Sequence, residues 1–182
     1  MNETNFHIAI IDQGWIDESL AQEDLYSHGH IDLTIAGKTI SDRSQKYGII
    51  DSALALLRTL AADHTPDHPL ADRLILHDCA TIPMMTCPMG INWDVVHWKN
   101  IVQIQNIIVF PSTIESKAVH FYDLAVRVPF DLYKDEIVAF AKAAQSLYYG
   151  VSKTFEDQFE AEQYQQFWHE FDTTLNIYTG AT

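Results

Sequence analysis

Short apolar runs and strict alternation of apolar and polar residues recur through the first two thirds of the chain. Both patterns are typical of β-strands, the first of buried strands and the second of strands with one solvent-facing side. The predicted strands are 6–11, 31–35, 38–40, 74–76, 91–98, 101–110, 118–122 and 124–128. Ala36-Gly37 and Lys99-Asn100 predict tight turns between neighbouring strands. We interpret 16–25 as a short helix or ordered loop and 27–30 as a turn.

Apolar residues recur with the helical period in three other stretches. The predicted helices are 50–63, 131–149 and 154–177. Gly150 suits the end of the second helix, and Thr154 with Asp157 forms a box-like start for the third. Strands precede helices, and no linker or low-complexity tract interrupts the chain. We therefore predict one α+β domain over 1–182, a mainly antiparallel sheet with one helix after the N-terminal strands and two long C-terminal helices.

Charge is distributed unevenly along this chain. There are 25 acidic and 11 basic residues, which gives a formal net charge of -14. No Lys or Arg precedes Lys38 or follows Lys153, although acids are frequent in both terminal stretches. If the two ends meet in the fold, one face is strongly anionic. This balance argues against a nucleic-acid or anionic-membrane binder, and it favours a basic protein partner, a cation or simple solubility.

The remaining composition indicates a cytoplasmic protein. Cys79 and Cys87 are the only cysteines, fewer than a small secreted domain usually carries. The start of the chain lacks a basic region followed by an apolar run, so we expect no signal peptide. No run of about 18 apolar residues predicts a membrane span. The sequence holds no phosphate loop, nucleophile elbow or paired CxxC, and we expect no cofactor.

Two segments carry a family resemblance. They are SHGHIDLTIAG at 27–37 and YGIIDSALALL at 47–57, and the Val128-Pro129-Phe130 step with the aromatic-rich last helix fits the same pattern. Over about half of its length the chain resembles small, acidic, cytosolic bacterial proteins of the immunity type, which neutralise a toxin. The resemblance implies an inhibitor that binds one toxin domain and catalyses no reaction.

Carboxylates from both ends of the chain and one aromatic residue are the predicted contacts with such a partner. Many antibacterial toxin domains are basic nucleases, and an anionic face would steer a basic partner quickly and selectively. The predicted partner-binding residues are Asp17, Glu18, Glu23, Asp24, Glu156, Asp157, Glu160, Glu162 and Trp168. The alternative explanations are solvation for the carboxylates and core packing for the tryptophan.

Cysteine and histidine side chains support a rival hypothesis, a small enzyme. Cys79 or Cys87 would be the nucleophile, with His77, His97 or His120 as base, with or without a metal ion. The metal-ligand set would be His77, Cys79, Cys87 and His97, although the Cys-x7-Cys spacing is not that of a zinc knuckle. Unreactive buried cysteines and hydrogen-bonded histidines explain the same residues. A third class is a structural protein or homo-oligomer, which a large exposed apolar patch would mark.

Overall fold

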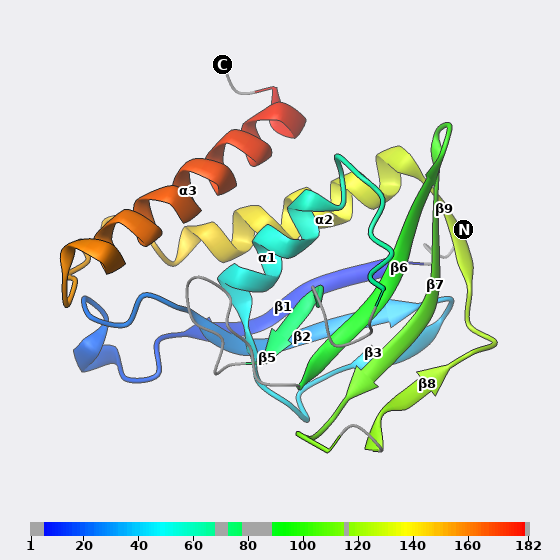
Figure 1. Ribbon diagram of the computed structural model, residues 1–182, viewed down its shortest axis with the longest axis horizontal. Coiled ribbons are helices and arrows are strands. Elements are labelled where there is room, and N and C mark those ends of the chain that lie inside the picture. The colour runs from blue at the N-terminus through cyan, green and yellow to red at the C-terminus, as the bar shows by residue number, and fades with distance from the viewer. Residues whose placement is uncertain (1–5, 68–72, 78–88, 115–116, 181–182) are drawn as a thin grey trace.

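The computed structural model of the protein describes residues 6–67, 73–77, 89–114 and 117–180 (Figure 1). Within these residues nine strands form one sheet, and three α-helices lie on one side of it. Every paired strand runs antiparallel to its neighbour. The structure therefore confirms the predicted α+β fold, with one helix after the N-terminal strands and two C-terminal helices.

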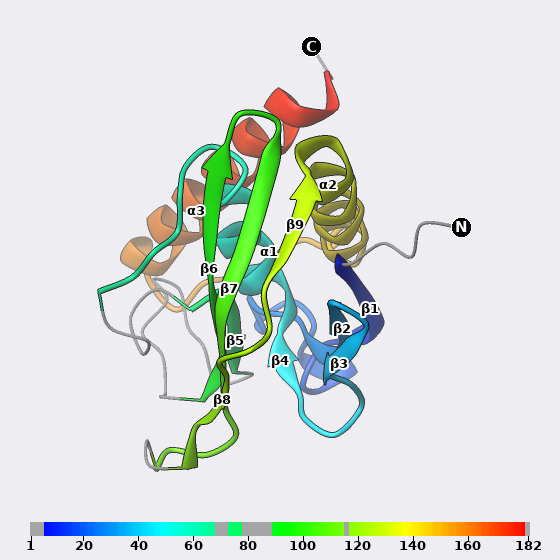
Figure 2. The same ribbon diagram turned by 90° about the vertical axis from the view of Figure 1, so that its right-hand side faces the viewer.

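The sheet has the strand order β1-β2-β4-β5-β6-β7-β8, with β3 beside β2 and β9 beside β7. Its strands are β1 (Phe6–Gly14), β2 (His28–Ile35), β3 (Lys38–Ser41), β4 (Tyr47–Gly48), β5 (Ile75–His77), β6 (Gly90–Trp98), β7 (Ile101–Phe110), β8 (Val119–Phe121) and β9 (Val126–Pro129). The sheet is curved, and the helices lie on its hollow side (Figures 1 and 2). On this side the first helix packs over β2, β4 and β5.

Helix α1 (Ile49–Arg58) is the centre of the core. Every residue from Ile49 to Leu57 is buried, because α2 (Phe130–Ser146) and α3 (Gln158–Thr179) cover the side that the sheet leaves open. The predicted helix ran to residue 63, but α1 ends at Arg58. Beyond it the Thr59 hydroxyl donates to the Leu56 carbonyl at 2.6 Å, and the chain then pairs with β6.

Two predicted hairpins are confirmed, and one predicted turn is wrong. Ala36 and Lys99 adopt positive φ angles of 51° and 57° in the β2–β3 and β6–β7 turns, as tight hairpin turns require. The segment 27–30 was predicted to be a turn, but β2 already begins at His28. Gly29 explains the difference, because a Cβ there would collide with the backbone carbonyl of Asp12 on β1. The glycine permits a close approach of two strands.

The two C-terminal helices differ from the predicted limits by a few residues, since α2 spans Phe130–Ser146 and α3 spans Gln158–Thr179. Helix α2 ends at Ser146, before Gly150, and α3 begins at Gln158 instead of residue 154. Asp157 caps α3 by accepting a hydrogen bond from the Glu160 amide at 2.8 Å. None of the helices in the described part of the chain combines the length and apolar character that a bilayer-spanning helix needs.

Candidate functional site

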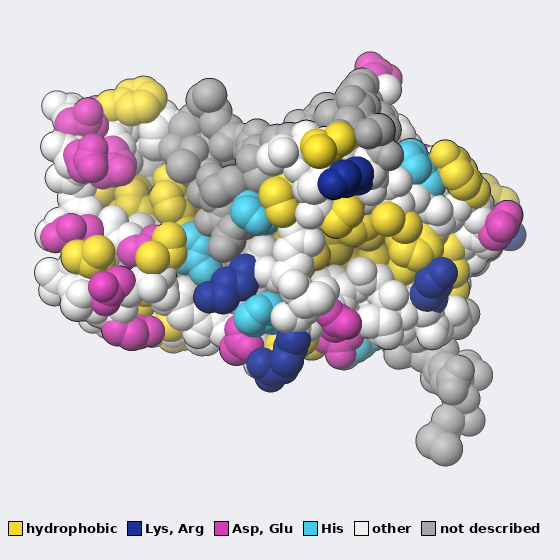
Figure 3. Space-filling view, turned by 90° about the horizontal axis from the view of Figure 1, so that it is seen from below, with side chains coloured by type: hydrophobic (Ala, Val, Ile, Leu, Met, Phe, Trp, Pro, Cys, Tyr) yellow, Lys and Arg dark blue, Asp and Glu magenta, His cyan; other side chains and the backbone are white. Residues whose placement is uncertain are grey.

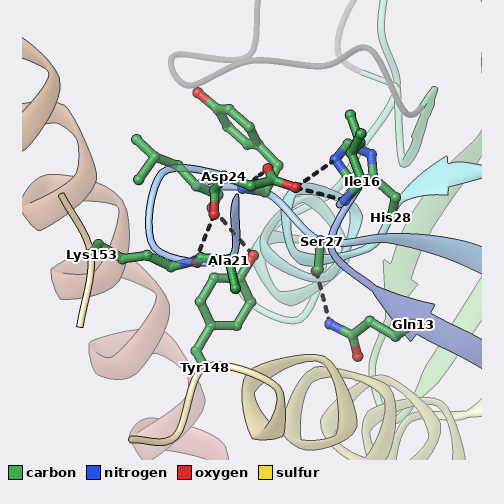
Figure 4. Close-up of polar contacts among 10 residues, drawn as sticks. Gln13, Ile16, Ala21, Asp24, Ser27, His28, Tyr148 and Lys153 are labelled. Carbon is green, nitrogen blue, oxygen red and sulfur yellow. Dashed lines mark hydrogen bonds and ion pairs between the residues drawn. The ribbon is translucent and has the colours of Figure 1, made fainter. Parts of the chain in front are cut away.

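The two acidic ends of the chain meet in the fold. We define the acid-rich end as residues 15–27 together with residues 151–162. The amide of Thr154 donates to the Gln22 carbonyl at 2.9 Å. Lys153 Nζ donates to the carbonyls of Ala21 and Asp24 at 2.7 and 2.6 Å (Figure 4). These contacts join segments about 130 residues apart in the sequence. The acidic residues of the two ends therefore lie on one surface.

Lys153 is the only Lys or Arg in the acid-rich end, and it serves the fold. Besides the two carbonyls, its ammonium lies 3.4 Å from the centre of the Trp15 ring and 5.2 Å from that of Tyr148. Burial lowers the pKa of Lys153 to about 8, against the opposing effect of the Asp24 charge. Its charge is directed at backbone and aromatic rings, away from the exposed carboxylates.

Most of the predicted carboxylates are exposed and have no basic neighbour. Figure 3 shows Asp and Glu side chains gathered at this end of the molecule. The exposed residues are Asp17, Glu18, Glu23, Glu156, Asp157 and Glu162, and Glu160 is half-buried. Within the described residues none of these seven contacts a Lys or Arg. Some of these carboxylates accept hydrogen bonds from nearby residues instead. Asp17 accepts from the Ser19 backbone amide, and Glu162 accepts from the side-chain amide of Gln158.

Asp24 differs from these residues because it orders the loop before β2. Its carboxylate accepts hydrogen bonds from the amides of Ile16 at 2.8 Å and Tyr26 at 3.1 Å. One oxygen lies 3.6 Å from His28 Nε2 (Figure 4). Burial raises the pKa of Asp24, but the His28 side chain and these amides more than offset it and lower the pKa. In the fold this carboxylate holds the loop, and its contact with a partner stays a prediction.

Trp168 lies in an aromatic cluster between α3 and the end of α2. It is half-buried, and its ring contacts those of Tyr148, Tyr164 and Phe171 at centroid distances of 4.8, 6.1 and 5.2 Å. The residue also lines a cavity of about 440 Å³ that opens beside the acid-rich end. The tryptophan therefore takes part in packing and also borders an accessible cavity.

The structure does not bring the candidate histidines together. His77 ends β5, next to the start of β6, whereas His97 lies near the other end of β6, 3.0 Å from Asp63. His120 stacks on Tyr122 in another part of the sheet. Cys79 and Cys87 lie outside the described residues. Among the residues that the structure does describe, no group of three His, Cys, Asp or Glu side chains could hold a metal ion.

Sequence reasoning missed a buried titratable group at the start of α1. Asp51 is fully buried, and neither of its carboxyl oxygens has a hydrogen-bond partner among the described residues. Burial raises the pKa of Asp51 to about 7, although the nearby His28 acts in the opposite direction. The signal in the sequence was an acidic residue inside the largely apolar run IIDSALALL.

Comparisons with family models, with curated proteins and with solved structures find no match for this chain. The joined ends, their exposed carboxylates and the adjacent aromatic cavity are therefore the basis for inferring a function.

Proposed function

We propose that this protein is a cytoplasmic, immunity-type inhibitor that binds a basic bacterial toxin domain through its acid-rich end and catalyses no reaction itself. The observation that carries the proposal is the meeting of two base-free stretches on one surface, joined by Lys153 and Thr154. Carboxylates that crowd together without a cation repel one another, and a basic partner relieves that repulsion. The same field would steer the partner during association.

Exposed apolar side chains among the carboxylates favour a binding surface over simple solubility. Within the acid-rich end Ile16 is 76% exposed and Phe159 is 64% exposed, and Leu20 and Phe155 are also exposed. Apolar and acidic side chains lie side by side at this end in Figure 3. Solvation alone accounts for the acids but leaves these large apolar residues unexplained. Protein interfaces combine apolar anchors with a charged rim.

Charge reversal tests the proposal when it avoids residues that hold the fold. Glu18, Glu23 and Glu156 are exposed, and within the described chain none of their carboxylates caps a helix or forms an ion pair. We would replace all three with lysine. The matched control replaces exposed acids outside this end with lysine, namely Asp67, Asp123 and Asp135, so both variants change the net charge equally. Of these, Asp135 lies 3.6 Å from Lys134, a surface pair that contributes little to stability.

The wild-type protein, immobilised in a lysate of its own host, is expected to retain one basic polypeptide that salt releases. The control variant is expected to retain it equally, and the acid-end variant to lose it, with affinity for the purified partner reduced at least about 100-fold. The purified partner should be toxic and be inhibited by the wild-type protein. Equal binding to both variants, or a partner whose activity is unaffected, would contradict the proposal.

A further inference from the structure

The cavity beside the acid-rich end has aromatic walls. It lies between the residues that follow α2, which provide Tyr148 and Tyr149, and α3, which provides Tyr164 and Trp168. The Trp168 ring stands nearly perpendicular to those of Tyr148 and Tyr164, at interplanar angles of 65° in both cases. With a volume of about 440 Å³, the cavity falls within the range of sites that take small ligands or single side chains, roughly 300–1,000 Å³.

A short polar chain runs along one side of this cavity. The Tyr149 hydroxyl donates to Gln145 Oε1 at 2.9 Å, and Gln145 Nε2 donates to Asp172 Oδ1 at 2.8 Å. In the described structure the other carboxylate oxygen of Asp172 receives no hydrogen bond. Partial burial raises the pKa of Asp172, although Gln145 and the neighbouring His169 act in the opposite direction. The cavity thus combines ring faces with a carboxylate that contacts no Lys or Arg among the described residues.

The same aromatic cluster already accommodates a cation on another side. The ammonium of Lys153 lies 5.2 Å from the centre of the Tyr148 ring and directly over Trp15. Tyr148 thus contacts the Lys153 ammonium and is also one of the residues that line the cavity. Aromatic faces attract cations through the ring quadrupole. A second cation in the cavity would also reach the Asp172 carboxylate, which Lys153 does not contact.

We propose that this cavity receives an arginine side chain of the basic partner, held between the aromatic walls and the Asp172 carboxylate. The inference rests on the proposed function. It specifies which side chain of the partner makes one of the contacts. Arginine fits better than lysine, because its planar guanidinium stacks on rings while several N–H donors remain free for a carboxylate. The neutral amide of Gln145 fixes one carboxylate oxygen, which leaves the other to accept from the guanidinium.

Blocked tripeptides with a central arginine, lysine or citrulline are suitable probes. Citrulline keeps the shape of arginine but carries no charge. The indole N–H signal of Trp168, assigned in NMR spectra with a Trp168→Phe variant, reports occupancy at constant ionic strength. The arginine peptide is expected to shift this signal with saturation, and the citrulline peptide to leave it in place.

Substitutions then locate the binding site. Asp172→Asn is expected to weaken arginine-peptide binding at least about fivefold, and Tyr164→Leu to weaken it as well. Asp123→Asn, which makes the same chemical change at an exposed position elsewhere, should leave it unchanged. Equal shifts from arginine and citrulline, equal affinity for lysine, or no Trp168 shift would each overturn the inference.

The outcomes separate this inference from the proposed function. If the arginine peptide binds the cavity but no basic partner is inhibited, the cavity remains a cation site and the inhibitor proposal fails. If a basic toxin binds and the acid-end variant loses it, while the peptide leaves Trp168 unchanged, the inhibitor proposal stands and the arginine anchor is wrong.

Discussion

The carboxylates of the acid-rich end and those of the remaining surface differ in their neighbours. Outside that end, Glu170 accepts hydrogen bonds from Arg58 Nε and a terminal nitrogen at 2.6 and 2.8 Å. Asp12 is 2.7 Å from both Arg43 and the Nδ1 atom of His30. Inside it, the described structure offers the exposed carboxylates no Lys or Arg. Glu170 and Asp12 are thus paired with cations of the fold, and we propose that the exposed carboxylates of the acid-rich end meet the cations of a partner.

This difference shows that net charge alone says little about a binding surface. Residues 38–153 carry 12 acids and 11 bases, and several of these bases form ion pairs. The acid-rich end has one lysine, and that lysine is committed to carbonyls and rings. The excess charge of the protein is thus concentrated where the chain ends meet.

The largest expected effect is a change of the free energy of unfolding with pH that comes from Asp51, a fully buried carboxyl group outside the acid-rich end. In the unfolded chain it loses its proton near the ordinary pKa of 3.8, whereas the folded protein holds the proton until about pH 7. The native state binds the extra proton between these values, so stability falls as pH rises through them. One pKa unit corresponds to about 1.4 kcal/mol, which gives a loss of roughly 4 kcal/mol.

Asp51→Asn cannot ionise and should remove this pH dependence. Urea unfolding at pH 4, 6 and 8 measures it, and the stability of the variant relative to wild type should rise across that window. Asp123→Asn, at an exposed turn, provides the matched comparison and should follow wild type. A difference between Asp51→Asn and wild type that stays constant with pH would show that Asp51 is ionised in the fold throughout.

The next largest effect is expected for the lysine that joins the two ends. Lys153→Met keeps the length and the apolar stem over Trp15 but removes the ammonium, so the carbonyls of Ala21 and Asp24 lose a donor. We expect a loss of about 1–2 kcal/mol in the free energy of unfolding. Faster amide exchange should be confined to 15–27 and 151–157. Lys142→Met on the exposed side of α2 is the control, and an equal loss there would refute the joining role.

The association rate with the partner should depend on salt concentration through the carboxylates of the acid-rich end. The Debye length shortens from about 10 Å at 0.1 M to about 3 Å at 1 M ionic strength. Stopped-flow association with the purified partner should therefore slow at least about tenfold between low and high salt. The variant with Glu18, Glu23 and Glu156 replaced by lysine should show a much flatter dependence. If the association rates of wild type and variant depended equally on salt, the electrostatic contact would lie outside the acid-rich end.

The smallest effect is expected for Glu170→Gln, which breaks the exposed ion pair with Arg58. Both side chains are nearly half exposed, at 47% and 44%, so the loss should stay below about 1 kcal/mol. The Arg58 hydrogen bond lowers the pKa of Glu170 from 4.5. The stabilisation is therefore complete above that value and lost as pH falls through the lowered pKa. Partner affinity should be unchanged, and a clear decrease would extend the binding surface to this region.

Local patterns predicted most of the fold because each depends on near neighbours in the sequence. The β6–β7 hairpin and its turn at Lys99 follow from alternation and turn chemistry. The complete burial of α1 could not be predicted, since it depends on α2 and α3 arriving from the other end of the chain. Helix α3 begins at Gln158, four residues after the predicted start, because Asp157 caps it. Thr154 instead contacts Gln22.

The candidate site was predictable only in part. The base-free ends were visible in the sequence, but their meeting depends on Lys153 reaching Ala21 and Asp24 across the fold. Asp24 carries the same charge as its neighbours, and only the structure shows its carboxylate bound to backbone amides. The cavity beside Trp168 requires the packing of two helices, so no pattern along the chain could have shown it.

Native mass spectrometry of the protein isolated from its own host tests the central claim most directly. Wild-type protein is expected to carry one basic polypeptide in a defined stoichiometry, and the complex should dissociate when the salt concentration is raised before desalting. The protein with Glu18, Glu23 and Glu156 replaced by lysine should appear without that polypeptide. A wild-type protein that carries no partner, or a variant that retains the partner in full, would contradict the account.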